Sequence, residues 1–220
     1  MKILKYAFIA LLFISCGARK AVESDRYHMQ TSKGNAFPKM YESPPNTILI
    51  QPVQKGLGIA DRSDVIVVEL IPLLQDKGYY VLPYKPTQDI IQKKGMLPEE
   101  LGADAVLQIQ VNDLDKDSRG ETWVSMTYTL QEVRTNDVLW EQTKEIFVDS
   151  KMQGGSGDFG EAVVRSLITF TATSSVSIPK LIKRVNEFAI ADLPYGSKHP
   201  NFRTDDTDYI WVLKWFSSMW

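Results

Sequence analysis

A strand, a helix and a second strand follow one another within residues 47–83, and this succession constrains the fold more than any other feature of the sequence. Residues 47–52 form a short, continuous apolar run, which is typical of a strand buried on both faces. Between residues 63 and 77, apolar side chains recur at helical spacing, at Val65, Val68, Ile71 and Leu74. A second apolar run at residues 79–83 completes a βαβ unit, so we expect its two strands to be parallel.

Two residues set the expected limits of the helix in this unit. Gly78 is expected to end it, because glycine readily adopts the left-handed conformation that follows a helix C-terminus. Pro72 is expected to kink or divide it, because proline lacks the N–H that an interior helical hydrogen bond needs.

The segments after the βαβ unit predict two short helical pieces and then a meander. A short helix is expected near residues 87–94, and Pro98 opens a further helical turn. Strand-like segments follow, with a turn at residues 135–137. They predict an antiparallel meander, at residues 107–111, 124–131, 138–140 and 146–148.

The last third of the sequence is helical before it becomes irregular. A helical stretch is expected from Glu161 to about Ala191, divided at Pro179, and an irregular loop follows at residues 192–208. The predicted fold class is therefore α/β. Its mixed sheet starts with a βαβ unit and continues with an antiparallel meander, and a long C-terminal helical segment follows.

The first sixteen residues have the organisation of a lipoprotein signal peptide. Lys2 and Lys5 precede an apolar run of nine residues, which is too short to span a bilayer but suits a signal peptide. Ser15 is the small residue before the cleavage point, and Cys16 follows where a bacterial lipobox ends. We therefore predict a signal peptide at residues 1–15 and a lipidated Cys16. The alternative is an ordinary signal peptide that contains a cysteine.

The chain after cleavage divides into three expected parts. Residues 16–45 are expected to form a lipidated tether and arm, flexible to about residue 35, although Phe37 and Tyr41 could instead pack on the domain. Residues 46–202 are expected to form the α/β domain. An aromatic-rich tail at residues 203–220 contains three tryptophans that are candidates for core packing, an interface or contact with the membrane–water boundary, namely Trp211, Trp215 and Trp220.

Charge and rare residues exclude several classes of function. The chain has 25 Lys+Arg and 27 Asp+Glu residues, so no basic excess exists to neutralise the phosphates of a nucleic acid. The single cysteine, Cys16, excludes a disulfide framework and a multi-cysteine zinc site. His28 lies in the expected tether and His199 in an irregular segment, so we expect no histidine-dependent nucleophilic catalysis. No catalytic residue, cofactor or metal ligand is predicted, and the chain is not expected to be an enzyme.

Two short motifs resemble ligand-binding sites without their usual context. Residues 155–160 match GxGxxG, but no strand or acidic residue follows at the usual offset, which favours a turn over a nucleotide site. Residues 112–117 begin like an EF-hand loop, but Ser118 and Val124 occupy the required Gly and Glu positions. This segment is expected to be a solvated turn, with a weak cation site as the alternative.

Catalysis by a pair of carboxylates, without a histidine, is a further hypothesis that the sequence leaves open. Pairs such as Asp104 and Asp113 supply the residue type that general acid–base catalysis by two carboxylates needs. Nothing in the sequence singles such a pair out.

Several segments together resemble a family of bacterial lipoproteins, domain of unknown function 799, of the meningococcal genome-derived antigen type. The segments are residues 45–50, 78–83, 102–107, 138–141 and 193–196 with His199 and Pro200. The resemblance implies a lipid-anchored outer-membrane protein that faces the periplasm, with an α/β domain similar to the TolB N-terminal domain. The resemblance also extends this domain's similarity to auxiliary lipoproteins of ABC-type transporters and to the curli-secretion lipoprotein. The resemblance implies no catalytic residues, and it implies oligomers or contacts with other envelope proteins.

The leading hypothesis is a non-enzymatic, lipid-anchored envelope protein that binds other proteins, as an accessory component of a transport or secretion assembly. Its expected partners are the membrane, through the covalent lipid, envelope proteins and further copies of itself. The alternative is a periplasmic carrier of a small ligand such as a lipid or glycan, which predicts a sizeable apolar pocket. An enzyme would instead need buried carboxylates in a cleft.

Overall fold

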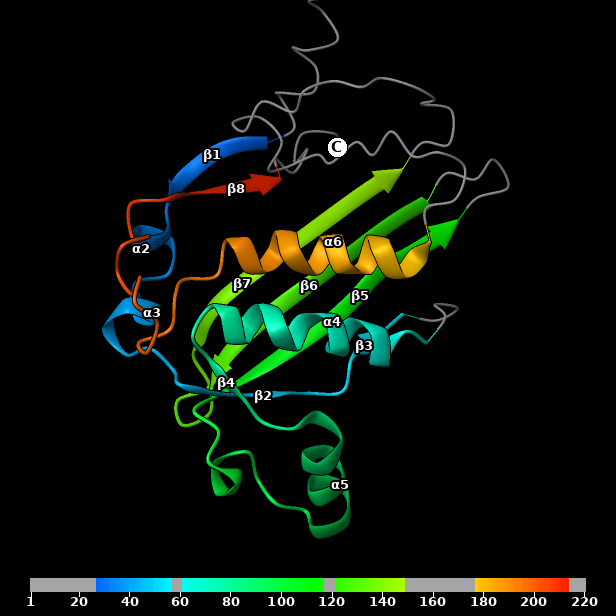
Figure 1. The fold of residues 1–220 in the computed structure, drawn as a ribbon, viewed down its shortest axis with the longest axis vertical. Coiled ribbons are helices and arrows are strands. Elements are labelled where there is room, and N and C mark those ends of the chain that lie inside the picture. Colours follow the sequence, from blue (N-terminus) through cyan, green and yellow to red (C-terminus); the bar gives the residue numbers. More distant parts are fainter. Residues whose placement is uncertain (1–26, 57–60, 117–121, 149–176, 214–220) are drawn as a thin grey trace, which may run out of the picture.

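A six-stranded mixed sheet and two helices packed on one of its faces form the centre of the molecule (Figure 1). The structure is a computed structural model, and it describes residues 27–56, 61–116, 122–148 and 177–213. The strands are β1 (Tyr27–Ser32), β2 (Thr47–Ile50), β3 (Gln54–Lys55), β4 (Tyr80–Val81), β5 (Ala105–Lys116), β6 (Thr122–Glu132), β7 (Val138–Val148) and β8 (Tyr209–Leu213). The helices are α2 (Lys33–Ala36), α3 (Pro38–Glu42), α4 (Ser63–Asp76), α5 (Tyr84–Lys94), the 3-10 turn η1 (Glu99–Leu101) and α6 (Ile178–Ala191).

The strand order of the main sheet is β4-β2-β5-β6-β7, with β3 paired to β5 beyond the end of β2. β2 is parallel to β4 and to β5, whereas β5, β6 and β7 are antiparallel neighbours. The predicted βαβ unit and the predicted meander are therefore both confirmed, and the fold class is α/β with a mixed sheet. Of the expected C-terminal helical segment, the described part is α6, with Pro179 in its first turn.

Of the two expected effects of Pro72, a kink or a division of the helix, the division is contradicted, because α4 runs without interruption from Ser63 to Asp76. The reason lies in the orientation of the helix. Pro72 is exposed, and Val68, the residue whose carbonyl loses its partner, is 66% exposed. That carbonyl can bind water, so the missing hydrogen bond costs less than it would in the core.

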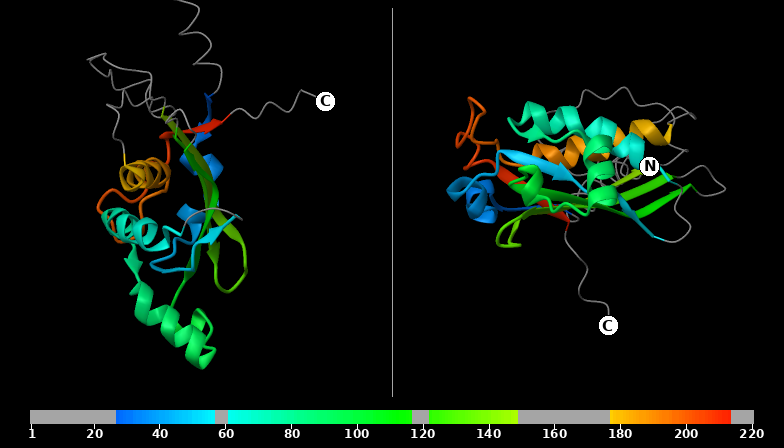
Figure 2. Two further views of the ribbon diagram at one scale, coloured as in Figure 1. Left: turned by 90° about the vertical axis from the view of Figure 1, so that its right-hand side faces the viewer. Right: turned by 90° about the horizontal axis from the view of Figure 1, so that it is seen from below.

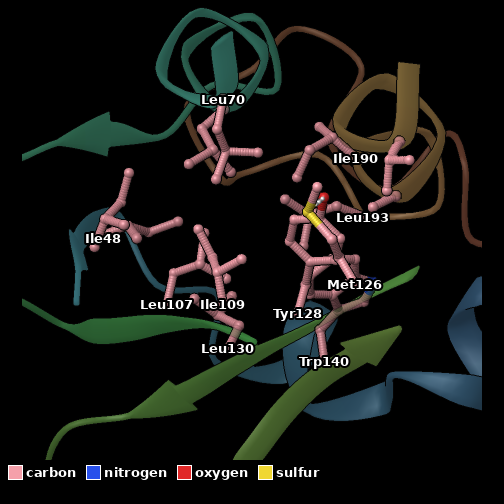
Figure 3. Close-up of a cluster of buried hydrophobic side chains, with 14 of the residues drawn as sticks. Ile48, Leu70, Leu107, Ile109, Met126, Tyr128, Leu130, Trp140, Ile190 and Leu193 are labelled. Carbon is pink, nitrogen blue, oxygen red and sulfur yellow. Dashed lines mark hydrogen bonds between the residues drawn. The ribbon is translucent and has the colours of Figure 1, made fainter. Parts of the chain in front are cut away.

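The main core lies between the sheet and helices α4 and α6. Both helices lie on the same side of the sheet, as Figure 2 shows. Side chains from the strands and from the two helices point towards one another in this core (Figure 3). The strand residues include Ile48, Leu107, Ile109, Met126, Tyr128, Leu130 and Trp140, and facing them are Leu70 of α4, Ile190 of α6 and Leu193 just after α6. A smaller cluster on the opposite side of β2 contains Leu49, Ala103 and Val106, with Leu82, Ile91 and Leu101 packed against it. Helix α5 and η1 therefore cover only the β2 end of that face.

The N-terminal arm is folded, which differs from the tether expected up to about residue 35. β1 pairs with β8 in a separate two-stranded antiparallel sheet, and helices α2 and α3 follow directly. Phe37, Met40 and Tyr41 are buried in the main core, which agrees with the alternative that this arm packs on the domain. Their spacing of three and four residues places them on one face of a short helical segment.

The C-terminal segment after residue 202 also contributes to the folded domain. Ile210 of β8 is buried in the main core, and Asp205 is 2% exposed. The expected boundaries at residues 45/46 and 202/203 therefore run through packed structure. The two chain segments meet at β1 and β8, far apart in sequence but paired in space.

Candidate functional site

The residues predicted to anchor the protein or to form an interface lie mostly beyond the described part of the chain. Cys16, Trp215 and Trp220 are outside the described residues, as is the GxGxxG match at residues 155–160. Trp211 lies in β8, where its Cα is the register partner of Met29 in β1. Lipidation and the aromatic interface therefore remain predictions.

His199 has a structural role in the loop after α6. Its Nδ1 accepts a hydrogen bond from the backbone N–H of Asn201 at 3.0 Å, and its ring stacks on Tyr195 with centroids 4.2 Å apart. His28 lies in β1. These contacts hold His199 in a turn of the chain.

Asp104 and Asp113 do not form a catalytic pair. Asp104 accepts hydrogen bonds from the backbone N–H groups of Asn46 and Thr47, at 3.0 and 2.9 Å, and so fastens the start of β2 to the start of β5. Asp113 lies nine residues further along β5, which at about 3.3 Å per residue is about 30 Å away. Two carboxylates at that separation cannot act on one bond.

The segment that begins like an EF-hand is a strand, so the expectation of a solvated turn is wrong. Residues 112–116 continue β5 in register with β6, with an irregularity between Val111 and Asp113. The Asn112 side chain donates to the Thr127 hydroxyl at 2.8 Å. Within the described ranges, no group of three or more His, Cys, Asp or Glu side chains could hold a metal ion.

A buried ion pair joins the N-terminal arm to the C-terminal segment. Lys33 Nζ lies 3.2 Å from Asp205 Oδ2, and both side chains are 5% exposed or less. The Tyr41 hydroxyl donates to Asp205 Oδ1 at 3.1 Å. Burial, reinforced by the Asp205 carboxylate, raises the pKa of Tyr41 far above its usual range, so this tyrosine stays a neutral donor.

Further lysines converge on the C-terminal end of α6. Lys33 and Lys77 donate to the Ala191 carbonyl at 3.0 and 3.2 Å, and Lys144 lies 2.6 Å from Asp192. Cations are stabilised there by the carbonyls at the end of a helix. Burial, and after it the nearby Lys33, lower the pKa of Lys77 to about 8.

This lysine cluster is the feature that sequence analysis missed most completely. Its members are far apart in the sequence, and lysine is almost never fully buried unless it is paired. No spacing rule identifies such a pair. Each contact links two elements of the fold, so the cluster holds the arm, β7 and α4 to the end of α6.

The cavities on the surface are open depressions. One of about 480 Å³ lies between α2, α3 and the loop before β8, and Ser32, Tyr41 and Arg203 are among its lining residues. Another of about 360 Å³ is lined by glutamines, two glutamates, an asparagine and apolar residues, namely Gln51, Gln108, Gln131, Glu99, Glu132, Asn136, Leu97, Pro98, Val106 and Val133. Between the sheet and helices α4 and α6, by contrast, close-packed side chains fill the space.

The face of β5, β6 and β7 that points away from α4 and α6 carries a ladder of polar side chains, which we call the polar face. Its members hydrogen bond across the strands. The bonds join Asn112 to Thr127, Thr127 to Thr143, Thr129 to Glu141 and Ser125 to Glu145, at 2.8, 2.8, 3.1 and 3.3 Å. Figure 2 shows no described helix over this part of the sheet. The polar face presents hydroxyl, amide and carboxylate groups on three hydrogen-bonded strands.

The matched family decides how the chain is classified. A family model described as "Putative lipoprotein GNA1162-like" matches residues 36–183, more than half of the chain. The chain belongs to this lipoprotein family. The resemblance predicted from the short sequence segments is thereby confirmed. No curated protein matches the GNA1162-like chain in sequence.

Solved structures similar to this GNA1162-like chain include three bacterial proteins. Lipoprotein GNA1162 from Neisseria meningitidis is 24% identical, with a TM-score of 0.44, covering 51% of this chain and 88% of its own. A PelC dodecamer from Paraburkholderia phytofirmans is 11% identical, with a TM-score of 0.45, covering 76% and 95%. The LpoB C-terminal domain from Salmonella enterica is 14% identical, with a TM-score of 0.37, covering 52% and 94%.

The segments that carry the family resemblance meet in space. Gly196 N–H donates to the Lys77 carbonyl at 2.8 Å, and the Tyr79 hydroxyl donates to the Pro194 carbonyl at 2.8 Å. A Cβ on Gly78, whose φ is +88°, would lie 2.7 Å from the Cβ of His199. The GNA1162-like segments thus fix how the loop after α6 closes over β4, which is a structural role.

No helix in the described part of this GNA1162-like chain is long and apolar enough to cross a membrane.

Proposed function

We propose that this lipoprotein is a non-enzymatic, lipid-anchored protein of the outer membrane that faces the periplasm and binds other proteins. It would serve as an accessory component of a transport or secretion assembly. The observation that carries the proposal is the polar face, a hydrogen-bonded surface that no described helix covers, on a sheet whose other face is filled by core. A platform of this kind suits contact with a protein, because the sheet fixes the positions of its donors and acceptors.

Cys16 supplies the proposed anchor, and the structure limits how far the domain would lie from it. Only residues 17–26 stand between Cys16 and β1. Even a fully extended chain of that length spans at most about 40 Å. The folded arm therefore shortens the reach expected from the sequence, and the domain would work close to the lipid surface.

The aromatic tail would leave the domain beside the anchor. The register of β1 and β8 pairs Tyr27 with Leu213, so the segment from Cys16 enters where the segment to Trp220 leaves. Tryptophan is enriched at membrane–water interfaces. We propose that Trp211, Trp215 and Trp220 form an interface at this end of the domain, with the membrane or with another copy of the chain.

Site-specific photo-crosslinking in intact cells tests the proposed function. A photoreactive residue at Thr129, on the polar face, is expected to crosslink a discrete envelope protein. The matched control replaces Gln75, an exposed residue on α4, and is expected to give no such product. Cys16→Ala should remove the Thr129 product together with membrane retention. Equal products from both positions, or none from Thr129 in the membrane-anchored protein, would contradict the proposal.

A periplasmic carrier of a small lipid or glycan is the alternative, and one cavity favours it. The depression of about 360 Å³ places glutamine amides beside apolar Val106 and Leu97, a combination that suits a ligand with polar and apolar parts. Mass spectrometry of the protein released from membranes under non-denaturing conditions separates the two hypotheses. A stoichiometric small ligand supports the carrier, and its absence supports the protein-binding function.

A further inference from the structure

β7 forms one edge of the main sheet, and it is the longer of the two edge strands. It has eleven residues, whereas β4 at the other edge has two. Among the described strands, only β6 pairs with β7. Helix α3 lies near the start of β7, where Lys39 pairs with Asp137 at 2.7 Å. From Glu141 onwards, no described strand pairs with the outer edge of β7, although β1 and β8 lie on that side of the sheet (Figure 1), so half of the backbone N–H and C=O groups of β7 face away from its partner β6.

The side chains of β7 differ sharply between its two faces. On the helix side, Lys144 is buried and paired with Asp192 under α6. On the polar face, Glu141 and Glu145 stand four residues apart with Thr143 between them. Their carboxylates accept hydrogen bonds from hydroxyl groups of β6, which leaves both negative charges on the outer surface.

On the described part of the polar face, the charged side chains beside this edge are all negative. Asp113 is exposed on the polar face of β5, in the row that contains Ser125 and Glu145. Lys144 is the basic residue of β7 and points to the opposite side, into the buried pair. The described part of the polar face therefore presents carboxylates without a lysine or arginine among them on β5, β6 or β7.

Antiparallel pairing of β7 with a second copy of itself, in the register centred on Thr143, is disfavoured by this arrangement. In an antiparallel pair with its two-fold axis at Thr143, Glu141 of each copy would face Glu145 of the other. Like charges directly opposite one another on neighbouring strands are destabilising. The same arrangement favours a strand that carries cations at the facing positions.

We propose that the outer edge of β7 binds an extended segment of a partner protein that has lysine or arginine at two outward positions four residues apart. This inference rests on the proposed protein-binding function and names the chemistry of the partner. The backbone of β7 would supply the ladder of hydrogen bonds, and Glu141 and Glu145 would select the basic side chains.

Short synthetic peptides test this proposal on the full chain purified from membranes in detergent. In the probe peptide every second residue is valine, and the residues between the valines are lysine, threonine and lysine in turn, so that the two lysines lie four residues apart on one face. The control peptide has glutamate in place of each lysine. The lysine peptide is expected to bind and to protect amides of β7 from hydrogen exchange. The double variant Glu141→Gln with Glu145→Gln should weaken the Kd by about 2- to 30-fold, as expected for two cross-strand ion pairs.

Matched variants distinguish recognition from a general effect of charge. Asp64→Asn with Asp89→Asn removes the same charge from α4 and α5, and its affinity for the lysine peptide should stay within about twofold of the wild type. Glu141→Lys with Glu145→Lys should reverse the preference and bind the glutamate peptide. Equal binding by the Gln and wild-type proteins, or protection away from β7, would overturn the proposal. If the crosslink at Thr129 persists in that case, the protein-binding function stands and only this edge is excluded.

Discussion

Replacing Lys33 with methionine should destabilise the protein by several kcal/mol, although the residue lies in a segment whose sequence predicts a tether. The Lys33 ammonium is 3.2 Å from Asp205 and 3.0 Å from the Ala191 carbonyl, and the two charged side chains are 5% and 3% exposed. Methionine keeps the length of the side chain but leaves the Asp205 carboxylate buried, with the Tyr41 hydroxyl as the donor that the described residues still supply. Breaking a buried ion pair from one side costs about 3–5 kcal/mol, so we expect that loss.

Urea unfolding followed by far-ultraviolet circular dichroism measures the effect. Lys39→Met is the matched control, because Lys39 lies in the same arm and pairs with Asp137 at the surface, where both side chains are about half exposed. That control should cost less than about 1 kcal/mol. The double variant Lys33→Met with Asp205→Leu should recover much of the loss, because neither charge then remains buried. A cost for Lys33→Met as small as that of the control would refute the buried ion pair.

Three further predictions address other parts of the fold. Tyr128→Phe and Asn186→Leu should each lower the free energy of unfolding in urea by about 1–3 kcal/mol, because each change leaves one partner of a buried 2.6 Å hydrogen bond without the other. The sum of the two losses should exceed the loss in the double variant, and additive losses would contradict this coupling. The pKa of Lys77 in the folded protein, near 8, lies below its unfolded value of about 10.4, so the unfolded chain binds more protons between pH 8 and 10. The free energy of unfolding should therefore rise with pH over this range, by up to about 3 kcal/mol. Lys77→Met should abolish the rise, and an unchanged slope would exclude this lysine as its source. Gly78→Ala should lower the Tm much more than Gly95→Ala, since both residues have positive φ but only the first Cβ would clash; equal shifts in differential scanning fluorimetry would argue against the close contact.

The parts of the fold that the sequence predicted are those with long, regular apolar patterns. The unit at residues 47–83 and the three strands of the meander show clear periods of helix or strand, and tertiary structure did not override them. The effect of Pro72 could not be judged in the same way, because it depends on which face of α4 meets water. Orientation relative to the core is not a local property of the sequence.

The arm and the lysine cluster were missed for a different reason. Phe37, Met40 and Tyr41 do repeat at helical spacing, but the repeat is too short to stand out from a polar background. Lys33 is a typical surface residue by type, and only its distant partner Asp205 makes its burial possible. Such pairs depend on how the chain folds back on itself.

The candidate functional surface could be predicted only in outline. The alternation of Thr127, Thr129 and Gln131 with apolar residues is typical of a strand with one polar face. That β7 would lie at the edge, with Glu141 and Glu145 on the side that no described helix covers, required the strand order and the fold. Strand order in a mixed sheet follows from long-range pairing, which the pattern of one segment does not encode.

Intact-mass and peptide mass spectrometry of the protein isolated from membranes tests the central claim, the lipid anchor at the first residue of the cleaved chain. We predict cleavage between Ser15 and Cys16 and a thioether-linked diacylglyceryl group on Cys16. A mature chain with a free thiol at Cys16, or one cleaved at a different position, would contradict it.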